Sequence, residues 1–233
     1  RAPAIRNDDP MAPPFNQLPR FLSRLIGAPV SSLLSIHLSP QELYQGVRSV
    51  QHSLETAYYD IIGKATGQPL FALFGERKQI SSVHYISLGS DTLSAITEDA
   101  ESRAGNAPVV QMKVFGPVDG EAKKIAAVLD VVPRDARVLV DGNGCWDVKE
   151  ACSLIGLFSD GRIWWEELCK TYEMNSDVAY KTGAPILLDQ CMQNLTSYVR
   201  ACSDGFSKGV SIKLSHLGGL TVAKVARDIC VAH

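Results

Sequence analysis

The sequence predicts an α/β protein, a (β/α) barrel of parallel strands and helices, on two observations. First, short apolar runs alternate with helix-like stretches after residue 76, which is the pattern of a parallel sheet. Second, three of these runs each end in an acidic residue at near-equal intervals: Asp141 follows VLV, Glu166 follows IWW and Asp189 follows ILL. Because the carboxyl ends of parallel strands meet at one mouth of a barrel, we expect the three carboxylates to lie close together.

The first part of the chain shows irregular and then helical patterns. Six prolines in about the first thirty residues indicate an irregular lead segment. From Ser39 a Ser-Pro cap, with Glu42 three residues later, precedes apolar residues at helical spacing through Ile62. We expect two helices here, separated by a break from Gly63 to Pro69.

The remainder alternates between strands and helices. Runs rich in β-branched and aromatic residues predict six strands, and the stretches between them carry helical spacing. The expected strands are 82–88, 109–114, 137–144, 162–168, 184–190 and 210–215, and the expected helices are 92–103, 120–131, 148–158, 175–181, 195–201 and one from Leu220. A closed barrel of this type needs eight strands, so the sequence predicts a barrel truncated after the sixth.

Composition narrows the class of protein. With 45% hydrophobic and 21% charged residues and a net charge of −2, the chain resembles an ordinary globular protein and has no basic stripe for nucleic acid. Its apolar runs are far shorter than the roughly 18 residues that span a bilayer. We therefore expect a cytoplasmic protein that binds neither nucleic acid nor membrane. The six cysteines form no CxxC pair and are expected to be reduced, mostly buried thiols.

The three acidic residues and two lysines predict a site for metal-assisted proton transfer. Carboxylate oxygens without a nearby His or Cys suit a hard cation such as Mg²⁺, so Asp141, Glu166 and Asp189 are the expected metal ligands. Lys113 and Lys213 end flanking strands and suit acid/base catalysis. Any one of these acids alone could instead be a helix cap or a solvated loop charge. Since side chains alternate along a strand, Glu167 is expected to point outward or to form a salt bridge.

The motifs together resemble the enolase superfamily, in its mandelate racemase and muconate lactonizing branch. ETAYYDIIGKATGQPLFALFG resembles the segment that leaves that family's capping domain, and QMKVFG resembles its lysine strand. VDGNGCW, WWEEL and ILLDQ resemble the three metal-ligand strands, and IKLSHLGGL resembles the opposite lysine strand. The resemblance implies a TIM-type barrel, with residues 1–76 as a partial N-terminal α+β capping domain and 77–233 as an incomplete catalytic barrel. It also implies Mg²⁺ as the cofactor and a homo-oligomer.

The resemblance further implies the type of reaction. CKTYEMNSDVAYKTGAPILLDQ is similar to cis-3-hydroxy-L-proline dehydratases and proline-betaine epimerases. The implied chemistry is removal of the proton α to a carboxylate through an enediolate, here as dehydration of cis-3-hydroxy-L-proline, a lyase reaction on a cyclic amino acid. Epimerisation of proline betaine, dehydration or racemisation of an acid sugar, and a catalytically silent truncated homologue are the alternatives. Gln111 stands where the family usually has a lysine, which removes one positive charge near the substrate.

Overall fold

The chain divides into two compact units. The computed structural model describes residues 23–34, 45–75, 83–89 and 92–233. The first unit comprises Arg1–Gln79, Gln193–Leu195 and Ile212–His233, and the second comprises Ile80–Met192 and Thr196–Ser211. The sheet belongs to the second unit. A domain boundary after residue 76 stays a prediction.

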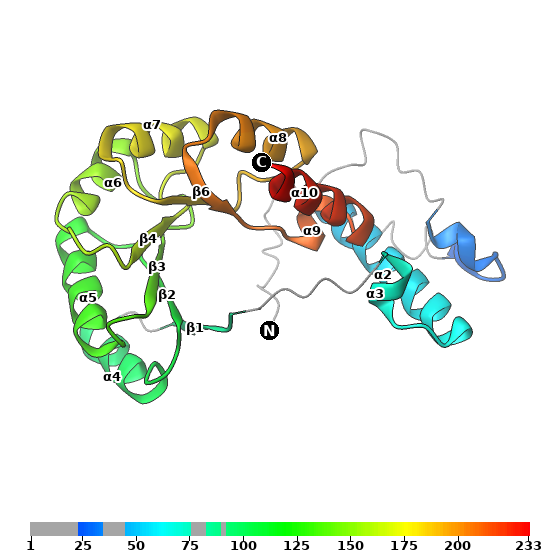
Figure 1. The fold of residues 1–233 in the computed structure, drawn as a ribbon, viewed down its shortest axis with the longest axis horizontal. Helices are drawn as coiled ribbons and strands as arrows, with labels where there is room; N and C mark the ends of the chain where they lie inside the picture. Colours follow the sequence, from blue (N-terminus) through cyan, green and yellow to red (C-terminus); the bar gives the residue numbers. More distant parts are fainter. Residues whose placement is uncertain (1–22, 35–44, 76–82, 90–91) are drawn as a thin grey trace. The chain divides into compact units, whose positions relative to one another are not determined.

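The second unit contains one six-stranded parallel sheet with the strands in sequence order (Figure 1). Helices α4 to α8 lie along one side of it, and consecutive helices from α4 to α7 pack against each other. This confirms the predicted α/β alternation of strands and helices. The strands are β1 (Tyr85–Leu88), β2 (Val109–Lys113), β3 (Arg137–Asp141), β4 (Ile163–Glu166), β5 (Ile186–Leu188) and β6 (Ser207–Val210), and the helices are α4 (Leu93–Arg103), α5 (Val118–Val131), α6 (Val148–Ile155), α7 (Tyr172–Thr182) and α8 (Leu195–Asp204).

The two faces of the sheet differ in chemistry. Alternate residues of the central strands, including Val110, Met112, Val138, Val140 and Trp165, are buried and form the apolar core with the helices. Because strand side chains alternate, the residues between them lie on the opposite face. In the register of β2, β3 and β4, these are the rows Gln111–Leu139–Trp164 and Lys113–Asp141–Glu166. The polar side chains of the predicted site therefore share one face of the sheet.

Local capping signals set the starts of two of these helices. Thr92 accepts a hydrogen bond from the Ala95 N–H at 3.3 Å, and α4 begins at the next residue, Leu93. Asp147 and Glu150 form a reciprocal capping box at the start of α6, with the Glu150 N–H donating to Asp147 at 2.8 Å. Both starts agree with the sequence prediction to within one residue.

The predicted sixth strand, 210–215, was wrong in its position. β6 runs over Ser207–Val210, and Lys213 is the N-cap of helix α9 (Leu214–Leu217). The physical reason is the length of the neighbouring strand. β5 offers three residues for pairing, with a register shift between Ile186 and Leu187, and the last backbone bond runs from the Ser211 N–H to the Leu188 carbonyl at 2.7 Å.

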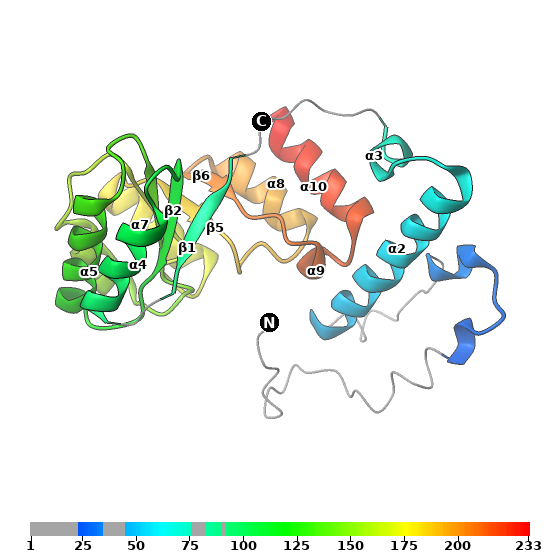
Figure 2. The same ribbon diagram turned by 90° about the horizontal axis from the view of Figure 1, so that it is seen from below.

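The first unit is helical in its described part. Helix α2 (Gln45–Thr66) packs against α9 and α10 (Leu220–Ala232), which are far away in sequence (Figure 2). The predicted helix start at Ser39 lies outside the described residues, and α2 continues through Gly63, where a break was expected. The shorter helices are η2 (Ser23–Leu25), η3 (Val30–Leu33) and α3 (Leu70–Leu73).

Glu55 of α2 joins the turn before α10. Its two carboxylate oxygens each lie 3.3 Å from the Thr221 N–H, and the side chain is 8% exposed. Gly219 lies against this carboxylate at φ +150°, and a Cβ there would stand 1.8 Å from Glu55 Oε2. Glycine is therefore required at this position by both conformation and space.

Two expectations from composition can be compared with the structure. All six cysteines are free thiols, as predicted, but the expectation that most of them are buried was wrong: Cys169 is buried, Cys145 is exposed and the other four are intermediate. Burial raises the pKa of Cys169 to about 12, so that thiol stays protonated at neutral pH. Within the described ranges, no helix combines the length and apolar character needed to cross a membrane.

Candidate active site

The ends of three neighbouring strands bring one lysine and two carboxylates into a row. Lys113 of β2 pairs in register with Asp141 of β3, which pairs with Glu166 of β4. The two carboxylates are 1% and 6% exposed, whereas the Lys113 side chain is 33% exposed. The site therefore combines buried negative charge with a lysine that reaches solvent.

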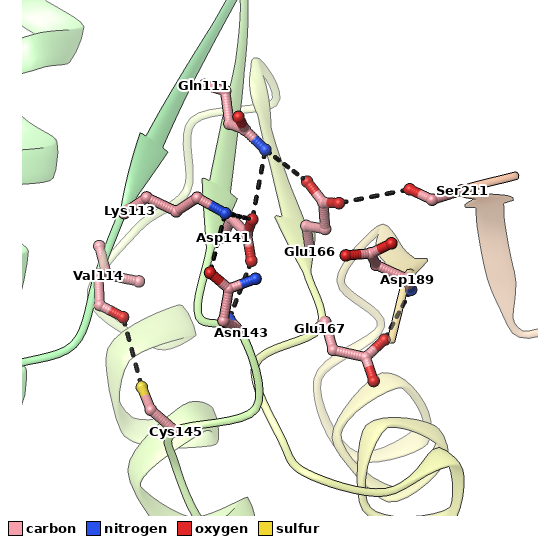
Figure 3. Close-up of polar contacts among 10 residues, drawn as sticks. All are labelled: Gln111, Lys113, Val114, Asp141, Asn143, Cys145, Glu166, Glu167, Asp189 and Ser211. Carbon is pink, nitrogen blue, oxygen red and sulfur yellow. Dashed lines mark hydrogen bonds and ion pairs between the residues drawn. The ribbon is translucent and has the colours of Figure 1, made fainter. Parts of the chain in front are cut away.

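Asp141 is held through both carboxylate oxygens (Figure 3). Oδ1 accepts the Asn143 backbone N–H at 2.9 Å, and Oδ2 accepts from the Lys113 ammonium in a close ion pair. Lys113 also donates to the Asn143 side-chain oxygen at 2.8 Å. Asn143 adopts φ +45°, a left-handed conformation that asparagine tolerates better than most residues. The Asp-Gly-Asn turn thus fixes the lysine and the first carboxylate relative to each other.

Gln111 bridges two of the predicted metal ligands. Its side-chain amide nitrogen donates to Asp141 Oδ2 at 3.3 Å and to Glu166 Oε2 at 3.0 Å. The side chain is 9% exposed. A neutral donor therefore stands between two buried acids.

Burial and the neighbouring carboxylates destabilise the charge of Glu166. Burial raises the pKa of the Glu166 carboxyl, and the nearby charges of Asp141 and Asp189 raise it further, while the hydrogen bond from Gln111 lowers it. Ser211, just after β6, lies 3.4 Å from the other Glu166 oxygen. A group of buried acids of this kind favours a bound cation or a bound proton.

Glu167 is buried, and the expectation that it points outward or forms a salt bridge was wrong. The side chain is 0% exposed and accepts the backbone N–H groups of Asp189 and Cys191 at 2.7 and 3.1 Å, together with the Cys191 thiol at 3.3 Å. The reason is that β4 ends at Glu166, and Glu167 has φ +39°, so strand alternation no longer sets its direction. Asp189, the third predicted ligand, is 2% exposed and lies directly after β5.

The predicted site residues fall in both units. Lys113, Asp141, Glu166 and Asp189 belong to the second unit, and the structure brings the first three together on adjacent strands. Lys213 belongs to the first unit, at the N-cap of α9. Its assignment as an acid/base residue stays a prediction.

The donor set fits Mg²⁺ in its chemistry. Asp141, Glu166 and Asp189 are buried acids that supply oxygen ligands, and a hard divalent cation would relieve their mutual repulsion. No group of three or more His, Cys, Asp or Glu side chains in the described part of the chain is already arranged to hold a metal ion. In this structure, N–H donors of Lys113 and Gln111 occupy oxygens of Asp141 and Glu166 instead. Each of these oxygens keeps a further lone pair, so a metal ion could bind while the N–H contacts remain.

Sequence reasoning missed the supporting contacts. The bridging role of Gln111 follows from its position two residues before Lys113 on one strand, a signal that was readable in the sequence. The roles of Ser211 and Glu167 depend on a strand end and a left-handed backbone that the local sequence does not reveal.

A match to a protein-family model shows which family this chain belongs to. The model described as enolase C-terminal domain-like matches residues 95–233, more than half of the chain. The chain belongs to the enolase C-terminal domain-like family. The six parallel strands with outer helices match the TIM-barrel domain of that family, and the mandelate racemase and muconate lactonizing branch is represented among the structural neighbours.

Individual enolase-family relatives extend this comparison. The chain is 30% identical over 181 residues to a cis-3-hydroxy-L-proline dehydratase of Roseibium aggregatum, covering 77% of this chain and 49% of that protein. It is 26% identical over 203 residues to an N-succinyl-L-Arg/Lys racemase of Bacillus cereus, covering 84% and 54%. A magnesium complex of an enolase superfamily member from Roseovarius nubinhibens superposes with a TM-score of 0.77 at 26% identity, covering 94% and 60%. The chain spans about half the length of the curated relatives it matches.

Proposed function

We propose that this chain takes part in Mg²⁺-dependent removal of the proton α to the carboxylate of a small substrate, with Lys113 as an acid/base residue. The observation that carries the proposal is the row Lys113–Asp141–Glu166 at the ends of three adjacent strands. Asp141, Glu166 and Asp189 would hold the metal, whose positive charge would stabilise the negative charge that develops on the substrate. A magnesium complex of a structural relative supports the choice of metal.

Lys113 has the position that an acid/base residue needs. Its ammonium donates to Asp141 and to Asn143, so it lies within hydrogen-bonding reach of the carboxylate proposed to bind the metal. In its neutral form the amine would accept the α-proton, while the electron pair of the broken C–H bond moves into the substrate carboxylate. Lys213 is proposed to act as the second acid/base residue.

Dehydration of cis-3-hydroxy-L-proline is the reaction we favour. Its support is the dehydratase relative at 30% identity. After loss of the α-proton, the 3-hydroxyl would leave with a proton from an acid, forming water and a carbon–carbon double bond. Gln111 supports a substrate pocket with less positive charge than a lysine at that position would give, because its amide is neutral.

Epimerisation is a second candidate. Its support is the racemase relative at 26% identity. In this reaction a proton would return to the same carbon from the opposite face, so no bond to oxygen breaks. Both reactions need an acid/base pair, and the substrate decides between them.

Exchange of the α-hydrogen in D₂O tests the proposal. NMR would follow cis-3-hydroxy-L-proline, proline betaine, an N-succinyl amino acid and a small panel of acid sugars, with and without Mg²⁺. We expect metal-dependent exchange that falls at least about 100-fold in Lys113→Ala and in Lys213→Ala. Loss of the substrate would indicate dehydration, and deuterium at an inverted α-carbon would indicate epimerisation.

Lys124→Ala is the matched control. Lys124 has a 14% exposed side chain and an ion pair with Glu121 at 2.8 Å, so its removal also breaks a shielded ion pair. Exchange in this variant should equal that of the wild type. Equal exchange in Lys113→Ala and the wild type, or no exchange with any substrate, would contradict the proposal.

A further inference from the structure

Glu167 is the most enclosed carboxylate among the described residues near the proposed site. Its side chain is 0% exposed, and its backbone adopts φ +39°, a conformation that a glutamate rarely takes. A buried charge requires compensating partners, and a strained backbone persists only where its surroundings enforce it. The proposed proton-transfer chemistry explains neither the burial of Glu167 nor its backbone conformation.

The contacts of Glu167 reach the segments that carry all three proposed ligands. Its carboxylate accepts the Asp189 N–H at 2.7 Å and the Cys191 N–H at 3.1 Å, which fixes the turn after β5. Its backbone carbonyl accepts the Gly144 N–H at 2.6 Å, in the turn that follows Asp141. Glu166 is its neighbour along the chain. One residue therefore ties the ends of β3, β4 and β5 together, as Figure 3 shows for Glu167 and Asp189.

We infer that Glu167 is a positioning residue that sets the affinity of the site for Mg²⁺ by holding Asp189 in place. This inference rests on the proposed function. β5 has three paired residues and a register shift between Ile186 and Leu187, so its ladder alone gives Asp189 little support. The carboxylate of Glu167 supplies that support from the neighbouring strand.

A glutamine cannot reproduce these contacts. Oε2 of Glu167 accepts the Asp189 N–H and Oε1 accepts the Cys191 N–H, so both oxygens are needed as acceptors. In Glu167→Gln one of these positions becomes an NH₂ group that faces a backbone N–H, donor against donor. The turn after β5 should then shift, and Asp189 with it.

Titration with Mn²⁺, followed by electron paramagnetic resonance and by competition with Mg²⁺, measures the effect without any substrate. We expect Glu167→Gln to bind both ions about 10- to 100-fold more weakly than the wild type, the size typical of lost support around a metal ligand. Amide hydrogen exchange at Asp189 and Cys191 should be slow in the wild type and faster in the variant.

Glu121→Gln is the matched control for a buried glutamate. Glu121 is 3% exposed and also accepts a backbone N–H, that of Gly116 at 2.9 Å. This variant should lose stability, because its ion pair with Lys124 is removed, but keep the wild-type metal affinity. The comparison separates a general loss of stability from a specific loss of metal binding.

A second variant keeps the negative charge at position 167 and shortens the side chain that carries it. Glu167→Asp retains the carboxylate but shortens it by one methylene group, so it should also bind Mn²⁺ at least about 10-fold more weakly. Wild-type affinity in a folded Glu167→Gln or Glu167→Asp chain would overturn this inference and leave the proposed function intact. If the wild-type chain binds neither ion, the proposed metal site fails and this inference fails with it.

Discussion

The two halves of the proposed site are built by different means. On β2, β3 and β4 the residues Lys113, Asp141 and Glu166 are placed by strand ladders in continuous register. On β5 the ladder is short and shifted, and the Asp189 N–H donates to the side chain of Glu167. Placement by a ladder needs only the strand pattern, whereas placement with the help of a side chain also needs one particular residue.

The largest effect on stability should come from disrupting the packing of β4, one of the three strands whose ladders place Lys113, Asp141 and Glu166. Trp165 of β4 is 3% exposed and packs near Phe158, so Trp165→Ala should lower the free energy of unfolding by about 3–5 kcal/mol, measured by urea denaturation. Trp164 is half-buried on the opposite face, with the Arg137 guanidinium 4.4 Å from its ring centroid. Trp164→Ala should cost about 1–2 kcal/mol. Equal losses would show that the two faces of β4 do not differ as described.

The sequence predicted the residues on β2, β3 and β4 better than those around Asp189 and Glu167. The positions of Asp141 and Glu166 follow from apolar runs of strand length, because alternation and parallel pairing hold throughout a ladder. Glu167 lies one residue beyond the strand, where alternation ends, and its direction depends on a positive φ. Lys213 follows a run that looks like a strand, yet pairing stops at Val210 because β5 offers no further partner.

A smaller effect, a gain in stability, should follow from removing the negative charge of Glu166 in the metal-free chain. Because the folded chain raises the pKa of Glu166, that group binds protons in the folded chain that the unfolded chain has already released. The metal-free chain therefore loses stability as pH rises between the unfolded and folded pKa values of this group. Glu166→Gln should stabilise the chain in EDTA at neutral pH by about 1–2 kcal/mol, flatten that pH dependence and abolish Mn²⁺ binding.

Glu173→Gln is the control for this change of charge. Glu173 forms an ion pair with Arg200 at 2.6 Å, with its own side chain 65% exposed, so the substitution should leave stability and Mn²⁺ binding almost unchanged. A loss of stability in metal-free Glu166→Gln would contradict the view that the carboxylates repel each other.

The smallest effect on stability should come from the N-terminal cap of helix α6. Asp147→Ala removes the capping box of α6, six residues after Asp141, and should cost about 1 kcal/mol in thermal or urea unfolding. If the ladder places Asp141, Mn²⁺ affinity should not change in this variant. Weaker Mn²⁺ binding would mean that the start of α6 also holds the ligand in place.

The Glu55 carboxylate occupies the start of α10, where an anion could otherwise bind. A glycine pair before a helix is a common place for a phosphate group, because free N–H groups and the helix dipole attract an anion there. At Gly218–Gly219 the position is already taken by a buried carboxylate that accepts the Thr221 N–H. A phosphate group at this turn would meet a carboxylate that already accepts the Thr221 N–H, so the Gly218–Gly219 turn is not a phosphate-binding loop.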